Sequence, residues 1–124
     1  MGTLMTGVEI VKLSAVDMIP LVNQSWSKMV ISEKTVSGNR GSLGYSVFRP
    51  GTKLDSVSHE TEEMAYVIAG KGELQLEDGV VVFEANDAIF IPPHTWHSVV
   101  NTGETDVVMI FGFPHPNYPP TERD

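Results

Sequence analysis

Apolar and polar residues alternate along much of the chain with the two-residue period of β-strands. Leu43, Tyr45 and Val47 show this alternation after a loop rich in Ser, Gly and Asn. The later stretch MAYVIAGKGELQLEDGVVVFEANDAIFIPP consists of short apolar runs separated by turn signals. These signals stand at Gly70-Lys71-Gly72, Asp78-Gly79 and Asn86-Asp87. Short strands at regular spacing predict an all-β sandwich or barrel.

Weaker patterns flank this region on both sides. Residues 27–31 and 107–113 each predict a further strand, and residues 8–21 predict an edge strand with a turn closed by Pro20. After Phe113 the sequence PHPNYPP is rich in proline and predicts an extended tail. We therefore divide one domain into residues 1–40, an N-terminal strand and loop region, residues 41–113, the barrel core, and residues 114–124, the tail.

One segment also admits a helix. The stretch SHETEEMAYVIA could begin a helix with Ser58 as N-cap, which would place His59 and Glu63 one turn apart. The β-branched and aromatic residues of AYVI, with a glycine after them, favour a strand. In a nearly regular strand His59 and Glu63 share one face. Glu63 would then lie opposite three apolar residues, namely Met64, Tyr66 and Ile68.

Composition places the chain among globular proteins of a single domain. It has 124 residues, of which 41% are hydrophobic and 19% charged, with a formal net charge of −8. No stretch concentrates Lys or Arg, so neither nucleic acid nor an anionic membrane is an expected partner. No apolar run approaches the roughly 20 residues of a spanning helix, and no basic leader precedes an apolar core. A cytoplasmic location is the resulting expectation.

The chain contains no cysteine, which limits the chemistry of any site. Disulfides, thiolate ligands and cysteine nucleophiles are excluded, so a metal ion would be bound through nitrogen and oxygen atoms. No Ser-His-Asp spacing suggests a protein nucleophile either. The remaining chemistry-bearing residues are histidines and carboxylates.

Two groups of residues have the spacing of known motifs, and through them the sequence resembles the cupin family. The first cupin motif, G-x5-H-x-H-x3-E-x6-G, is matched by Gly51, His59, Glu63 and Gly70. The second, G-x5-P-x-G-x2-H-x3-N, is matched by Pro92, His97 and Asn101. The resemblance covers about residues 41–113 and implies a β-barrel of the jelly-roll type, the double-stranded β-helix.

Three positions depart from these motifs. Val57 replaces the first histidine of the first motif, Asn86 replaces the opening glycine of the second, and His94 replaces its inner glycine. Asn86 tolerates the positive φ of a turn and so preserves it. His94 is either a rim residue of the pocket, a surface residue or a substitute ligand, and Val57 is expected to line the pocket.

The resemblance also implies a metal site. Cupins typically bind metal through three histidines and one glutamate, which leaves His59, Glu63 and His97 here as ligands of one divalent ion per chain. Iron, manganese, zinc and nickel are all compatible with two imidazoles and a carboxylate. The alternative is a cupin that lost its first histidine and then its metal. Asn101 and Gly70 are interpreted as turn or capping residues, and His115 as solvent exposed.

Two functions follow from this interpretation. The first is a small metal-dependent enzyme, of dioxygenase, isomerase or lyase type, acting on a small oxygenated organic molecule. The second is a non-catalytic binding or sensor module for a sugar, acid or aromatic ligand. No residue is assigned a catalytic role beyond metal binding. Apolar residues on the outer face of the sheet, together with Trp96, further predict a homodimer.

Overall fold

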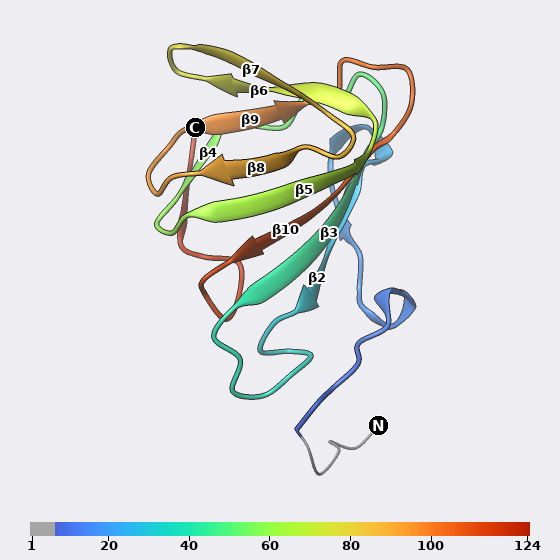
Figure 1. Ribbon diagram of the computed structural model, residues 1–124, viewed down its shortest axis with the longest axis vertical. Helices are drawn as coiled ribbons and strands as arrows, with labels where there is room; N and C mark the ends of the chain where they lie inside the picture. Colours follow the sequence, from blue (N-terminus) through green and yellow to red (C-terminus); the bar gives the residue numbers. More distant parts are fainter. Residues whose placement is uncertain (1–6) are drawn as a thin grey trace.

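The computed structural model describes residues 7–124 as two antiparallel β-sheets that face each other (Figure 1). The larger sheet has the strand order β1-β2-β3-β10-β5-β8, and the smaller has the order β11-β4-β9-β6-β7. The described residues contain no α-helix, only two short 3-10 turns at Leu13–Ala15 and Val22–Gln24. The predicted all-β class is confirmed.

The strands follow the alternation in the sequence. The larger sheet contains β1 (Ile19–Pro20), β2 (Trp26–Ile31), β3 (Ser42–Phe48), β5 (Glu63–Ala69), β8 (Ala88–Ile91) and β10 (Val107–Phe113). The smaller sheet contains β4 (Val57–His59), β6 (Lys71–Leu76), β7 (Gly79–Glu84), β9 (His97–Val100) and β11 (Thr121–Arg123). Among these residues no helix is long and apolar enough to cross a membrane.

Strand β5 shows how the pattern sets the two faces of the larger sheet. Ala65 and Val67 are buried against the opposite sheet. The residues between them, Met64, Tyr66 and Ile68, are 54%, 45% and 43% exposed, as the parity of Glu63 predicted. The inner side chains of both sheets form a single core, which includes Phe48, Leu74, Phe83, Val107, Met109 and Phe111. Burial of each large apolar side chain stabilises the fold by roughly 1.5–3 kcal/mol.

Two of the predicted turns have the conformation that their residues suggest. Gly70 has φ +87°, and an added Cβ would lie 2.5 Å from the carbonyl oxygen of Asp106, so only glycine fits between β5 and β6. Asn86 also adopts a positive φ, of 76°, and takes the place of the motif glycine. Asn101 ties a further turn, because its side chain donates to the carbonyls of Phe48 and Thr105.

The helical alternative for residues 58–69 is wrong, and the strand that AYVI favours is confirmed as part of β5. The expectation that His59 and Glu63 share one strand is wrong. The chain ends β4 at His59, bends through residues 60–62, and begins β5 at Glu63 in the other sheet. His59 and Glu63 therefore approach each other across the space between the sheets, and not along one strand.

The proline-rich residues 114–120 form no helix or strand, but the residues after them form a strand that the sequence pattern does not predict. Residues 121–123 form β11, which pairs antiparallel with β4 and adds an edge strand to the smaller sheet. His115 is half-buried, where the sequence predicted exposure, and its Nδ1 accepts a hydrogen bond from the backbone N–H of Asn117. Proline residues exclude helix and central strand in this segment, but they leave the last residues free to pair at an edge.

Candidate metal centre

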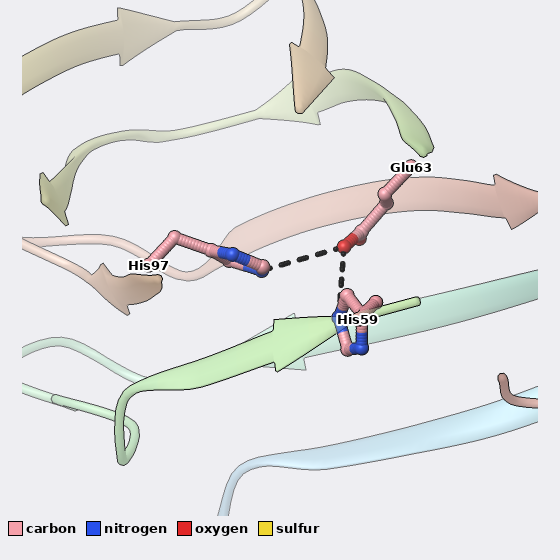
Figure 2. Close-up of side chains that lie close together, drawn as sticks. All are labelled: His59, Glu63 and His97. Carbon is pink, nitrogen blue, oxygen red and sulfur yellow. Dashed lines mark ion pairs between the residues drawn. The ribbon is translucent and has the colours of Figure 1, made fainter. Parts of the chain in front are cut away.

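Three side chains from three strands converge between the two sheets (Figure 2). His59 is the last residue of β4, Glu63 the first of β5, and His97 the first of β9. The β4–β5 bend delivers Glu63 to the opposite sheet, so its carboxylate reaches back toward both imidazoles. The three residues that the sequence predicts as a group therefore lie together in the structure.

The distances within the cluster are short. Glu63 Oε1 lies 3.2 Å from His59 Nε2 and 3.5 Å from His97 Nε2. One potential ligand atom from each residue lies within 4.8 Å of the other two. The three side chains are only 3%, 14% and 5% exposed for His59, Glu63 and His97 respectively. Such a buried group of donors has little competition from bulk water.

The other ring nitrogen of each histidine has a partner of its own. His97 Nδ1 lies 2.8 Å from the carbonyl oxygen of Thr95, which can only accept, so this nitrogen carries the proton. The Thr121 hydroxyl donates to the carbonyl of Pro119 and therefore accepts from His59 Nδ1, at 2.7 Å. In its neutral form each ring therefore directs an unprotonated Nε2 toward Glu63.

This arrangement brings three electron-pair donors together. Among residues 7–124, Glu63 Oε1 is a buried oxygen without a hydrogen-bond partner. Two imidazole lone pairs and a carboxylate repel one another unless a cation lies between them. Two histidines and one carboxylate are a donor set that Fe, Mn, Zn and Ni accept. The residues therefore fit a divalent metal ion.

The protonation equilibria show the same demand for positive charge. Burial alone would raise the pKa of Glu63, but the imidazoles of His59 and His97, which attract the carboxylate when they carry a proton on Nε2, outweigh burial and lower the pKa. Burial alone would lower the pKa of His97, but contacts with Glu63 and the Thr95 carbonyl raise it. Without a metal, a proton on His97 can thus partly fill the role of the ion.

Aromatic rings pack around His59. The rings of Phe113 and Tyr118 lie edge-on to it, with centroids 5.1 and 5.2 Å away. Burial, and then the charge of Glu63, raise the pKa of the Tyr118 phenol, although Arg123 and hydrogen bonds to Thr121 and Arg123 act in the opposite direction. The phenol therefore keeps its proton at neutral pH.

A cavity of about 600 Å³ opens next to the cluster, and His59, Glu63 and His97 all form part of its wall. Apolar side chains provide most of the rest, among them Phe48, Met109 and Phe111 from the larger sheet. Residues 19–22 also line it and are held over the barrel by Asn23, whose side chain donates to Thr52 Oγ1 and to the Pro50 carbonyl. The cavity thus has mostly apolar walls, with the His59–Glu63–His97 cluster at one end and a few other polar residues, Arg123 among them, in the wall.

A family model described as a cupin domain matches residues 44–113 of the 124 in the chain. The chain belongs to the cupin family. The solved polyketide cyclase RemF from Streptomyces resistomycificus superposes on this cupin with a TM-score of 0.78 and 20% identity, over 94% of this chain and 84% of that one. The jelly-roll architecture inferred from the motifs is therefore confirmed.

Curated relatives of this cupin are distant. Polyketide synthase CurC of Streptomyces cyaneus is 27% identical over 68% of this chain and 55% of its own length. The 5-nitrosalicylic acid 1,2-dioxygenase of a Bradyrhizobium species is 27% identical over 53% of this chain and 32% of its own length. The chain thus spans about half of the first of these proteins and a third of the second.

The two unusual motif residues occupy different places in this cupin. Val57 lines the cavity and lies directly opposite His97 in the β4–β9 pairing. His94 is exposed, with φ 58°, and neither lines the cavity nor belongs to the cluster. His94 contacts the site only through its backbone N–H, which donates a hydrogen bond to the carbonyl oxygen of His59 at 2.8 Å. The positive φ explains why the motif has glycine at this position.

Sequence reasoning missed the residues that the C-terminal segment supplies to the site. Thr121 orients His59, Tyr118 packs against it, and Arg123 lines the cavity. No motif marks them, and the prolines before them predict only an extended tail. The single signal was TER after Pro120, a short run that could pair with a strand edge.

Proposed function

We propose that this cupin is a metal-dependent enzyme, of dioxygenase, isomerase or lyase type, that acts on a small oxygenated organic molecule bound in the cavity. The observation that carries the proposal is the buried, unpartnered Glu63 Oε1 facing two imidazole nitrogens whose tautomers are fixed by Thr121 and Thr95. A purely structural histidine pair would not need this convergence. One wall of the cluster also opens onto a ligand-sized cavity.

The residues of the cluster and those of the cavity walls have different roles in this proposal. His59, Glu63 and His97 would hold one divalent ion, with Fe, Mn, Zn and Ni as the metals that the donor set admits. When bound, such an ion polarises a carbonyl, enolate or carboxylate oxygen of the substrate. The apolar walls bind the carbon skeleton and exclude water from the reacting end. Val57 contributes an apolar surface where a fourth ligand would otherwise stand.

The names of the relatives support this class of substrate. One is a polyketide cyclase and another a dioxygenase of 5-nitrosalicylic acid, both acting on oxygenated carbon skeletons. At 20% and 27% identity, they support a class of molecule and not a particular reaction. A cavity with mostly apolar walls and one metal-binding end suits such molecules.

Turnover by reconstituted protein tests the proposal. Chelator-treated protein would be loaded separately with Fe²⁺, Mn²⁺, Zn²⁺ or Ni²⁺ and incubated with a panel of aromatic acids, hydroxy acids and β-diketones, with products identified by mass spectrometry. We expect conversion with at least one metal and none with chelated protein or with His97→Ala. Tight ligand binding without any conversion would instead identify a binding module.

A further inference from the structure

The cavity contains a positive charge that the metal cluster does not use. Arg123 in β11 lines the cavity, although the chain as a whole carries a formal charge of −8. Within the described part of the chain, the arginine that forms an ion pair is Arg49, with Asp106, and no carboxylate pairs with Arg123. Arg123 hydrogen-bonds with the Tyr118 hydroxyl, which is neutral and leaves the positive charge uncompensated. A guanidinium without a carboxylate partner beside an apolar cavity is a binding group for an anion.

Strand pairing directs Arg123 toward the cluster. In the smaller sheet Arg123 lies opposite Val57, and Val57 lies opposite His97, so the three form one row across β11, β4 and β9. Residues directly opposite each other in antiparallel strands project from the same face. His97 and Val57 both border the cavity, and Arg123 therefore borders it as well. Thr121 has the same parity in β11 and touches His59, which agrees with this orientation.

The mouth of the cavity lies at this end of the row. Several lining residues are exposed, namely Ile19, Val22, Tyr118 and Arg123. Asp55, the other carboxylate in the wall besides Glu63, is also exposed and borders a second, polar cleft. Its charge is solvated there and leaves Arg123 available. A ligand entering here meets Arg123 at the rim, Val57 next, and the cluster beyond.

Resting on the function proposed above, we propose that the substrate is an organic anion with a largely apolar body, and that Arg123 binds its carboxylate beside Val57. Val57 supplies no donor at the place where the cupin motif has a histidine, so no protein ligand stands between Arg123 and His97 in this row. A carboxylate fits there with one positive group on either side, the guanidinium and the ion of the cluster. The apolar walls then receive the rest of the molecule. Arg123 is thus a specificity-determining residue.

A matched pair of ligands tests this inference. Naphthalene-2-carboxylate and its uncharged amide have the same apolar body and differ in charge. Calorimetric titration would be done on the Zn²⁺-loaded and on the metal-free protein. We expect the carboxylate to bind more tightly than the amide, and Arg123→Gln to weaken carboxylate binding by about ten- to a hundredfold, as for loss of a charge-assisted contact. Binding of the amide should change less than about twofold, since it lacks the charge.

Two further variants serve as controls. Arg40→Gln removes the same charge from an exposed loop outside the cavity and should leave both affinities unchanged. Arg123→Lys keeps the charge without the planar fork and should give an intermediate affinity, which also guards against misfolding of the glutamine variant. Equal binding of the two ligands, failure of both to bind, or an unchanged affinity in Arg123→Gln would overturn the inference. A protein that binds no zinc but still shows the Arg123-dependent preference would contradict only the proposed metal-dependent function.

Discussion

The ring nitrogens that face away from Glu63 determine what His59 and His97 can bind. Because the Thr121 hydroxyl and the Thr95 carbonyl each accept a hydrogen bond from an Nδ1, both Nε2 atoms present lone pairs to the same buried oxygen. The motif spacing was sufficient to predict His59, Glu63 and His97 as a group. It could not predict the two threonines, because a hydroxyl or carbonyl that orients a ligand has no fixed distance in sequence from it.

Val57 is the residue through which the open side of the site can be tested. It lies opposite His97, on the cavity wall, so an imidazole placed there would face the cluster. We predict that Val57→His binds metal more tightly but turns over a bidentate substrate more slowly, since a fourth protein ligand takes a position that substrate would use. Metal affinity by competition with a chelator and turnover by product formation check the two parts.

A gain of both metal binding and activity in Val57→His would contradict this prediction. If the wild-type protein binds no metal, and Val57→His gains both metal and activity, then Val57 marks a site that was lost. The substitution Val99→His offers a control on the same wall, since Val99 lines the cavity but does not occupy the motif position. It should not strengthen metal binding.

Among the elements, the short strand β11 has the largest effect on the site relative to its length. Its three residues pair with β4 and supply Thr121 and Arg123 to the cavity side. The interior strands were predictable from alternation and turn residues, and β10 was predicted with the bounds that it has. β11 was not, because an edge strand of three residues after two prolines has too short a pattern to show a period.

The contribution of β11 to metal binding is predicted to act through one hydroxyl. Thr121→Val removes the acceptor for His59 Nδ1 but keeps the shape and strand preference of the side chain. We expect metal affinity to fall by about ten- to a hundredfold, the usual effect of losing a group that orients a ligand. Chelator competition measures it, with circular dichroism as the check on folding. Thr105→Val, at an exposed threonine, is the matched control, and equal affinities in the two variants would remove the role of Thr121.

At the scale of the whole molecule, a group of exposed apolar side chains lies on the outer face of the larger sheet. Met64 in β5 lies directly opposite Phe90 in β8, and these residues are 54% and 59% exposed. Tyr66 and Ile68 continue the same face along β5, at 45% and 43%. An outer face of this kind is usually covered by another protein surface. The sequence alone predicts which residues form this face, because in a strand Met64, Tyr66 and Ile68 point away from the side on which Glu63 lies.

We propose that this face forms the contact of a homodimer, because a second copy offers an identical apolar surface and a two-fold axis can pair them. Sedimentation equilibrium at micromolar concentration should give twice the chain mass of 13.6 kDa. Phe90→Glu should shift the protein to monomer by placing a charge in the contact. Val82→Glu, at a residue 76% exposed on the edge strand β7, should remain dimeric. A wild-type monomer under these conditions would exclude the contact.

The central claim is that His59, Glu63 and His97 together hold one divalent ion, and elemental analysis of purified protein tests it most directly. Inductively coupled plasma mass spectrometry, after gel filtration and with the protein quantified by amino-acid analysis, measures metal ions per chain. The account predicts about one ion per wild-type chain and almost none in His97→Ala, while circular dichroism shows the β-fold retained in both. Full occupancy in His97→Ala, or a wild-type chain that takes up no metal when Fe²⁺, Mn²⁺, Zn²⁺ and Ni²⁺ are each supplied, would contradict it.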